Sequence, residues 1–365
     1  MLDHWLEPFS ISNKNFANYS LARHIGNFHD KNQPLSPRQC VLIGIDKQAA
    51  DAVRSALYPM SWAFPDFKLT DLGNVRKKSN DFIIPLLKEV MESQLIPILI
   101  GAQTSSIFAQ FQSFLNIRDQ VSLIAIDDRI SFTKDAKKGN KTHYLNKIFH
   151  QRRESLFHFG LIGSQAHFTD PDLINWLYQQ NFEYLRLGEA QKNLEEVEPL
   201  LRDGDLLSLN INALKQIDVP GQMNPSPSGF SLEEACQLSR YAGMSDKLRS
   251  FGIYGIDTKS KRKLTFTTQA VAQLIWYFIE GHYHKKGDYP ATNKGMTEYV
   301  VDRKGDNSKL TFWKSPNSGR WWLQLVAKTS HKLERHRLIP CSYDDYIKAT
   351  QQELPDRLWN AFKRF

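Results

Sequence analysis

The amino-acid sequence predicts an α/β fold, in which a mainly parallel sheet is covered by helices on both faces and is followed by a small α+β extension. Short apolar runs alternate with amphipathic stretches from about residue 40 to residue 284, and this alternation is typical of a parallel sheet between two helical layers. After His284 the pattern changes to short β-type runs separated by turn signals. Polar residues follow several of the apolar runs, where parallel α/β sheets place their ligand sites.

Each element of the main body follows from the spacing of its apolar residues. A buried parallel strand is a short apolar run, whereas a helix repeats apolar residues every three or four positions. The predicted strands are 40–45, 67–73, 96–101, 121–126, 156–162, 184–187, 206–211 and 251–256. The predicted helices include 52–57, 81–94, 104–115, 171–180, 231–242 and 267–280. Residues 1–38 are polar and irregular, and we expect them to pack over a main domain that spans 39–284.

The extension, residues 285–365, carries most of the basic charge. The chain has 365 residues and a formal net charge of +8, and the extension holds 16 Lys/Arg against 9 Asp/Glu, which leaves 31 against 30 elsewhere. The extension should contain strands near 299–301, 310–313 and 321–326, followed by two helices. Because the main body is neutral, any binding of nucleic acid would depend on the extension, and the sequence does not favour that partner.

The sequence indicates a cytoplasmic protein. Its first residues lack the basic start and apolar core of a signal peptide. No run approaches the roughly 18 apolar residues of a membrane span. Cys40, Cys236 and Cys341 are far apart, and this spacing indicates neither a disulfide framework nor a cysteine metal site.

Asn210 and Asn212 end one buried run, and a loop rich in Pro, Gly and Ser follows at 220–229. Side chains two positions apart on a strand point the same way, so we expect the two amides to share a site at the end of this strand. An Asn-x-Asn pair is a poor metal site, but it is what two amide replacements would leave of Asp-x-Asp.

Over about residues 39–284, ordered motifs resemble those of the ureohydrolases, the family of arginase, agmatinase and formimidoylglutamase. Residues 52–57 are similar to the family's Ala-Ile-Arg-x-x-Leu, 71–74 to Asp-Leu-Gly-Asp, 97–105 to the Gly-Gly-Asp-His-Ser segment, 126–131 to Asp-Ala-His-x-Asp, 208–212 to Ser-x-Asp-x-Asp and 225–229 to Pro-x-x-Gly-Gly. Segments 144–148, 318–322 and 340–345 look most like the formimidoylglutamase-like proteins of the Bacteroidetes type. The resemblance implies a three-layer α/β/α arginase-like fold.

The resemblance also implies a binuclear manganese site, whose bridging hydroxide attacks the central carbon of a linear amidine. The family binds the metals with two histidines and four aspartates. The matching positions here are Thr104, Asp127, Arg129, Ser131, Asn210 and Asn212. Their formal charges sum to zero, and an ion pair 4 Å apart contributes about 1–4 kcal/mol even when screened. We therefore expect no manganese and no other cofactor. Gly255 begins the segment that replaces the family's substrate-binding glutamate.

Three interpretations of the remaining side chains stay open. In the first, an Asp127–Arg129 ion pair fills the metals' volume as a structural plug, hydrogen-bonded by Gln103, Ser131 and the two asparagines. In the second, the pocket binds a small ligand without metal. In the third, the protein hydrolyses C–N bonds of formimidoylglutamate, arginine or agmatine with atypical metal ligands. We favour the first, which predicts a catalytically inactive pseudoenzyme that acts as a binding or scaffold protein.

The extension offers a possible protein interface. Trp313, Arg320 and Trp322 combine aromatic bulk with positive charge, as protein-binding surfaces do. Alternation along 321–326 predicts that Trp321 packs on the main domain and that Trp322 faces outward to an unknown protein partner. Ureohydrolases are often trimers or hexamers, so a homo-oligomer also stays open.

Overall fold

The computed structural model describes residues 2–11, 16–28, 34–115, 117–130, 132, 134, 143–303, 308–325 and 336–364. Within these residues ten strands form one sheet in the order β1-β4-β3-β5-β10-β9-β6-β7-β8, and β2 pairs with β4. Every neighbouring pair is parallel except β1 with β4. The predicted parallel sheet is therefore confirmed, with one short antiparallel strand at its edge.

The strands of this sheet are β1 (Leu6–Glu7), β2 (Gly26–Asn27), β3 (Cys40–Gly44), β4 (Leu69–Val75), β5 (Ile96–Ile100), β6 (Val121–Ile126), β7 (Leu156–Ser164), β8 (Glu183–Arg186), β9 (Leu206–Asn210) and β10 (Ser250–Tyr254). The helices that accompany it are α1 (Lys47–Leu57), α2 (Asn80–Glu92), α3 (Ile107–Phe114), α4 (Tyr144–Gln151), α5 (Pro171–Gln179), α6 (Leu187–Lys192), α7 (Glu198–Arg202), α8 (Leu232–Gly243) and α9 (Lys261–Tyr283).

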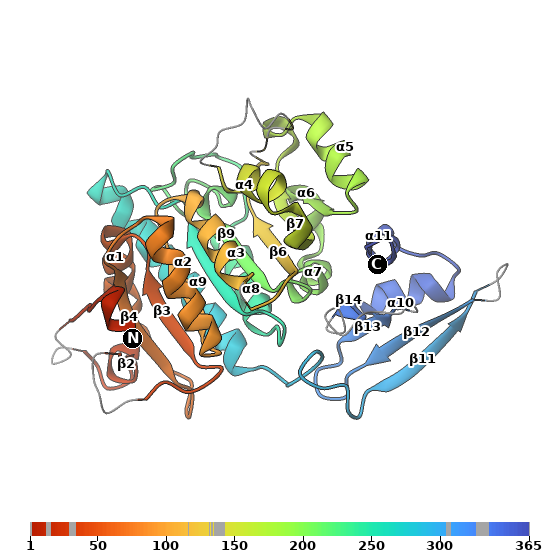
Figure 1. Cartoon of the computed structure of the whole chain (residues 1–365), viewed down its shortest axis with the longest axis horizontal. Helices are drawn as coiled ribbons and strands as arrows, with labels where there is room; N and C mark the ends of the chain where they lie inside the picture. Colours follow the sequence, from red (N-terminus) through yellow and green to blue (C-terminus); the bar gives the residue numbers. More distant parts are fainter. Residues whose placement is uncertain are drawn as a thin grey trace.

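Two apolar cores lie on opposite faces of the sheet. One core joins the sheet to α1, α8 and α9. The other joins it to α2, α3, α4 and α5, and Figure 1 shows α2 and α3 crossing the near face of the strands. Since buried apolar area drives folding, the sheet is stabilised from both sides. The fold is thus the three-layer α/β/α arrangement that the alternating pattern predicts.

The start of helix α8 was predicted from a local sequence signal, the capping residues Ser231 and Glu234. The Ser231 hydroxyl accepts a hydrogen bond from the backbone N–H of Glu234, and the Glu234 carboxylate accepts one from the Ser231 N–H. This capping box satisfies two N–H groups that the first turn leaves unpaired. Helix α9 is longer than predicted, because its first turn, Lys261–Lys263, is basic and exposed and carries no apolar repeat.

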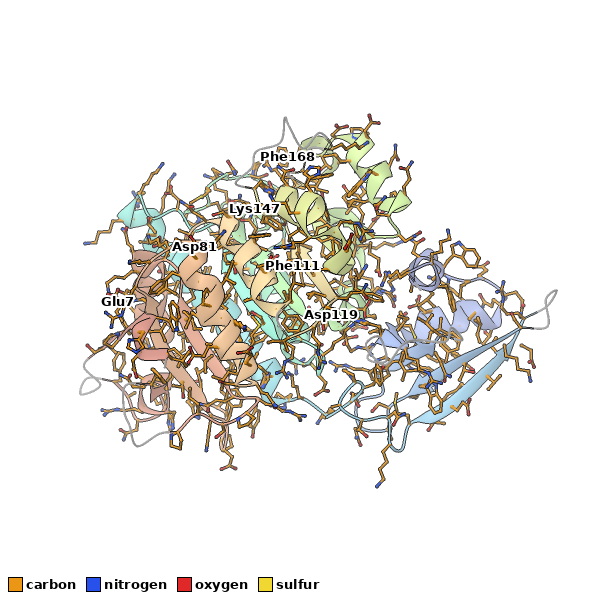
Figure 2. The ribbon with its side chains drawn as sticks, viewed as in Figure 1. Glu7, Asp81, Phe111, Asp119, Lys147 and Phe168 are labelled. Atoms are coloured by element: carbon orange, nitrogen blue, oxygen red, sulfur yellow. The ribbon has the colours of Figure 1, made fainter. Side chains whose placement is uncertain are left out.

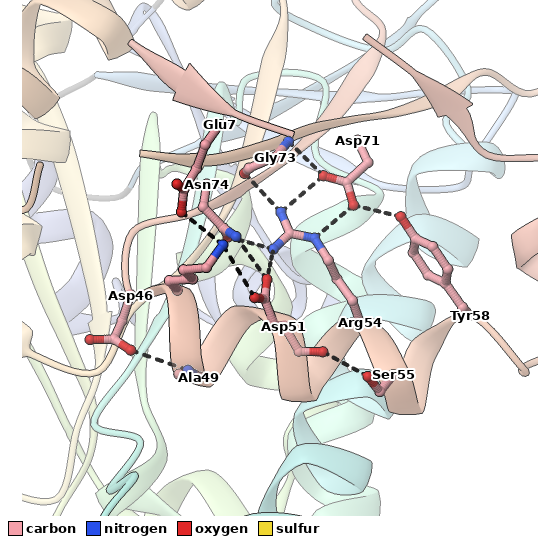
Figure 3. A network of polar contacts seen from close by, with 11 residues as sticks. Glu7, Asp46, Ala49, Asp51, Arg54, Ser55, Tyr58, Asp71, Gly73 and Asn74 are labelled. Atoms are coloured by element: carbon pink, nitrogen blue, oxygen red, sulfur yellow. Dashed lines mark hydrogen bonds and ion pairs between the residues drawn. The ribbon is translucent and has the colours of Figure 1, made fainter. Parts of the chain in front are cut away.

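A buried cation joins α1 to β4 (Figure 3). The Arg54 side chain is fully buried, and its Nε and Nη2 donate to the two carboxylate oxygens of Asp71 at 2.7 and 2.9 Å. Its Nη1 donates to Asn74 Oδ1 at 2.6 Å, and Tyr58 donates its hydroxyl proton to Asp71. A buried charge is tolerated only when it is paired and hydrogen-bonded. These residues, which carry part of the family resemblance, therefore hold a helix to the sheet.

The extension contains an antiparallel sheet in the order β11-β12-β13-β14, packed against two helices. Its elements are β11 (Thr297–Asp302), β12 (Lys309–Lys314), β13 (Trp321–Gln324), β14 (Leu338–Cys341), α10 (Tyr343–Thr350) and α11 (Asp356–Phe362). The meander and both helices match the α+β extension expected from sequence. Strand β14 was not predicted, because a four-residue run that contains proline gives a weak strand signal.

The prediction for the two neighbouring tryptophans is wrong, because their faces are exchanged. Trp321 packs within the extension and stacks on Tyr346 at a centroid distance of 4.8 Å. Trp322 is fully buried, with the guanidinium of Arg202 from α7 at 4.3 Å from its ring centroid. Alternation assigns the two rings to opposite faces, but it does not say which face the main body covers.

The other predicted interface residues also make contacts within the chain. Arg320 forms an ion pair with Glu198 at 3.1 Å and donates to the Met244 carbonyl at 3.0 Å. Trp313 is half-buried and donates its indole N–H to Gln324 at 2.7 Å. Arg320 and Trp322 therefore attach the extension to its own main body, so the predicted partner surface is an intramolecular contact at these positions.

A second set of charges strengthens this attachment. Arg364 reaches back to Glu183 and Asp203, at 2.7 and 3.2 Å, and Lys247 contacts Asp203 at 2.6 Å. These two cations hold the pKa of the buried Asp203 carboxyl at about 2, against the opposing effect of burial. Among the described residues, no helix is long and apolar enough to cross a membrane.

Candidate functional site

Four neighbouring strands bring the predicted site residues to the carboxyl edge of the sheet. In the sheet order β5-β10-β9-β6, Gln103 and Thr104 follow β5, Gly255 follows β10, Asn210 ends β9 and Asp127 follows β6. Figure 2 helps to locate this edge, since the labelled Phe168 lies near it and the labelled Asp119, just before β6, lies at the other end of the strands. Parallel α/β sheets bind ligands beyond their carboxyl edge.

Asp127 is at the centre of this group and is buried, with 6% of its surface exposed. One carboxylate oxygen accepts hydrogen bonds from the Asn210 side-chain amide at 3.0 Å and from the Asp128 backbone N–H at 2.9 Å. Burial and the neighbouring Asp128 carboxylate raise the pKa of Asp127 well above its ordinary value. The Asn210 amide nitrogen therefore hydrogen-bonds to Asp127 Oδ1, the oxygen that would contact a cation if Asp127 were a metal ligand.

The predicted Asp127–Arg129 pair is wrong, because Arg129 pairs with Asp128. Its Nε and Nη2 lie 2.9 and 2.5 Å from one Asp128 carboxylate oxygen. The guanidinium also lies 4.2 Å from the Phe168 ring centroid. Asp128 is only 1% exposed, and a buried carboxylate needs a charged partner. Asp127 has less need of one, because it already accepts a hydrogen bond from the Asn210 amide. The chain leaves the strand at this point, so spacing along a strand does not apply.

The side chains of Asn210 and Asn212 accept hydrogen bonds from backbone N–H groups and do not face each other. Asn210 Oδ1 accepts from the backbone N–H of Asn212 at 3.1 Å, and Asn212 Oδ1 accepts from that of Asn224 at 3.2 Å. Asn210 is the last residue of β9, whereas Asn212 lies in a short 3₁₀ turn, Ile211–Ala213. The amide of Asn212 thus fixes the loop that covers this edge.

Gln103 and Thr104 lie at the rim of the group. Gln103 is exposed and accepts a long hydrogen bond from the Ser105 hydroxyl at 3.4 Å, and Thr104 is half-buried. Within the described residues neither side chain makes a hydrogen bond to Asp127. Ser131 lies outside the residues that the structure describes, so its predicted role stays a prediction.

Because Gly255 has no side chain, the Asn210 side chain can pack directly against its backbone. Its φ is +89°, and a Cβ built there would lie 2.2 Å from Asn210 Oδ1. Glycine is the residue that adopts this backbone conformation without steric cost. A larger residue at position 255 would therefore meet both backbone strain and the asparagine side chain.

This donor set does not fit a pair of manganese ions. Mn²⁺ prefers carboxylate, imidazole and water ligands, whereas these positions supply amides, a hydroxyl and a guanidinium beside one carboxyl. In the part of the chain that the structure describes, no three His, Cys, Asp or Glu residues are grouped so that they could hold a metal ion. The described residues of this group can position backbone and can hydrogen-bond a neutral ligand.

Two residues of this group were missed in the sequence. Asp128 is the partner of Arg129, and its place directly before an arginine at a strand end was an available signal. Tyr144 of α4 is fully buried, and burial with the nearby Asp127 raises its pKa well above the ordinary value. It belongs to a segment that carried the subgroup resemblance, but that pattern did not indicate contact with the site.

Comparisons with known proteins give structural matches only. No family model and no curated protein matches the sequence. Formimidoylglutamase from Bacillus subtilis superposes with a TM-score of 0.63 at 15% identity, covering 76% of this chain and 95% of that one. A manganese-containing formiminoglutamase from Trypanosoma cruzi gives 0.59, 14%, 68% and 94%. Agmatine ureohydrolase from Thermoplasma volcanium gives 0.55, 16%, 74% and 97%. The chain therefore has the arginase-like ureohydrolase fold.

Proposed function

We propose that this protein is a catalytically inactive ureohydrolase-like protein, which has lost the binuclear manganese site and acts as a binding or scaffold protein, in the cytoplasm. The observation that carries the proposal is the Asn210 amide, which donates to the buried Asp127 carboxyl. A metal ion would have to displace that donor. Arg129, at another former ligand position, is held by Asp128 and Phe168.

Metal content and hydrolysis test this proposal directly. Purified protein equilibrated with Mn²⁺ should retain no stoichiometric metal after desalting, as measured by plasma mass spectrometry. It should release neither formamide from formimidoylglutamate nor urea from arginine or agmatine. Two manganese ions per chain, together with turnover of one of these substrates, would overturn the proposal and establish an amidine hydrolase with atypical ligands.

A charge-restored variant supplies the positive control. It carries the substitutions Thr104→His, Arg129→His, Ser131→Asp, Asn210→Asp and Asn212→Asp. Restoring anionic oxygen and imidazole ligands should bring back Mn²⁺ binding, because the chain has the arginase-like fold and these side chains are the donors that Mn²⁺ prefers. Its matched control is Asn193→Asp, which makes the same amide-to-carboxylate change at an exposed position and should bind no metal.

A further inference from the structure

The amino edge of the sheet, opposite the former metal site, contains a cavity of about 1150 Å³. Its lining comes from the segments that enter the strands and from the end of α9. Arg38 and Gln39 precede β3, Lys68 precedes β4, and Asp205 and Arg249 precede β9 and β10. At about 1150 Å³ the cavity is slightly larger than typical small-molecule binding sites, which span roughly 300–1,000 Å³, so it has room for a small ligand. Nothing in the ureohydrolase resemblance accounts for this cavity.

Within the described residues, four cations of the lining have no directly bonded counter-ion: Arg38 and Arg118, which are exposed, and Arg249 and Lys285, which are half-buried. None of their side chains forms a hydrogen bond or an ion pair there, in contrast to the buried Arg54, which has several partners. Burial lowers the pKa of Arg249, and the charges of Arg38 and Arg118 act in the same direction. The four groups therefore lie close enough to repel one another.

Lys285, the fourth of these cations, also indicates that positive charges converge in the cavity. Burial lowers its pKa to about 8; Cys40 and Asp246 oppose this effect, whereas the nearby Arg249 and Arg38 add to it. A lysine with this pKa is still mostly protonated at pH 7, because an ammonium group loses its proton only above its pKa. The cavity therefore contains convergent positive charge at neutral pH.

Two carboxylates of the lining offset part of this charge, since Asp205 acts on Arg249 and Asp246 on Lys285. Asp205 accepts a hydrogen bond from the Ser122 backbone N–H at 2.8 Å, and Asp246 accepts one from the Asp288 N–H at 2.8 Å. The remaining two acids, Asp66 and Glu92, are exposed. Of the two further lysines of the lining, Lys247 is paired with Asp203 and Lys68 is exposed. Two carboxylates thus face a cluster of four cations.

We propose that this cavity binds a small phosphate-bearing anion. Guanidinium groups match phosphate oxygens with paired hydrogen bonds, and a multiply charged ligand would relieve the repulsion among several of them at once. Aromatic surface adjoins the cations, since Phe67 and Tyr283 line the cavity and Phe67 also lines a shallow groove with Trp62 and His24. A nucleotide could place its base there, whereas an inorganic polyphosphate would use the cations alone.

This proposal is independent of the loss of catalysis, because the two sites lie at opposite edges of the sheet. Titration calorimetry on the full chain, at low and at moderate salt, would use tripolyphosphate, ATP and adenosine as probes. We expect saturable binding of tripolyphosphate and ATP, weakened by salt. Tighter binding of ATP would assign the aromatic groove to the base, and equal binding would assign the site to phosphate alone. Absence of binding of both anions, or adenosine binding as tight as that of ATP, would overturn the proposal.

Charge variants locate the binding. Arg249→Gln should weaken tripolyphosphate binding about 10- to 100-fold, as expected for loss of a charged hydrogen-bond donor. Arg118→Gln, at an exposed loop position, serves as a second variant if the first does not fold. The matched control is Arg262→Gln, which removes the same charge from an exposed position in the first turn of α9. Equal weakening by Arg262→Gln and Arg249→Gln would show non-specific attraction and contradict a site in the cavity.

Discussion

The two edges of one sheet treat their polar groups in opposite ways. At the carboxyl edge the side chains of Asp127, Asn210 and Arg129 bond to neighbouring protein groups. At the amino edge a large cavity lies beside cations that bond to nothing in the described chain. Two of these cations, Arg249 and Lys285, are half-buried, and burial lowers the pKa of both, which is why we propose an anionic ligand there. The comparison teaches that the two edges of one sheet can differ in how far their polar side chains are paired within the protein.

The largest expected effect comes from adding charge to the carboxyl edge. Asn210→Asp would put a second carboxyl against the buried Asp127, where the amide nitrogen now lies 3.0 Å from Oδ1. An uncompensated buried charge costs about 3–5 kcal/mol of unfolding free energy. The measurement is urea denaturation at pH 8, with Asn193→Asp as the exposed control. If the variant kept wild-type stability, or gained stability with Mn²⁺, the carboxyl edge would still hold an open cation site.

The pH dependence of this variant has a definite sign. Two carboxyls that share a site bind one proton tightly, which raises their folded-state pKa above the ordinary value of about 4. The folded state then holds more protons than the unfolded state, so stability falls as pH rises from about 4 through the raised pKa. We therefore expect a smaller loss at pH 5 than at pH 8. An equal loss at both values would mean that the two carboxyls do not interact.

Gly255→Ala tests how tightly the carboxyl edge is packed around Asn210. The new methyl group would meet Asn210 Oδ1 at 2.2 Å, and the residue would be strained at φ +89°. Together these effects should cost about 2–4 kcal/mol. Gly295→Ala is the matched control, because Gly295 has φ +81° but nothing within 4 Å of the built Cβ, so it isolates the strain at about 1 kcal/mol. Equal losses in the two thermal melts would reveal free space beside Asn210.

The smallest effect is expected at the amino edge. Arg249→Gln should change the free energy of unfolding by no more than about 0.5 kcal/mol, because it removes no hydrogen bond and relieves repulsion from Arg38 and Arg118. The same substitution at Arg54, which loses the Asp71 pair, should cost about 3–5 kcal/mol. Denaturation without added phosphate measures both. A large loss for Arg249→Gln would give this arginine a structural role and remove the contrast between the edges.

The sequence predicted the sheet and the grouping of polar residues at its carboxyl edge because both depend on local patterns. Apolar runs give the strands, and Asp127, Asn210 and Gly255 each lie at a strand end. The choice of partner for Arg129 could not be predicted, since it depends on how the backbone turns after β6. The cationic cavity was missed for a related reason. Arg38, Arg118, Arg249 and Lys285 come from four separate segments, and no local spacing connects them before the sheet forms.

The attachment of Arg364 has a consequence for the order of folding. Its guanidinium contacts Asp203 and Glu183, which precede it by 161 and 181 positions. During synthesis these two carboxylates emerge from the ribosome long before Arg364. Until Arg364 is made, the charges of Glu183 in β8 and of Asp203 after α7 are therefore incompletely neutralised. The last part of the chain therefore stabilises β8 and the end of α7 only after synthesis is complete. A nascent chain halted before residue 364 should be more susceptible to proteases around residues 183–203 than the finished protein.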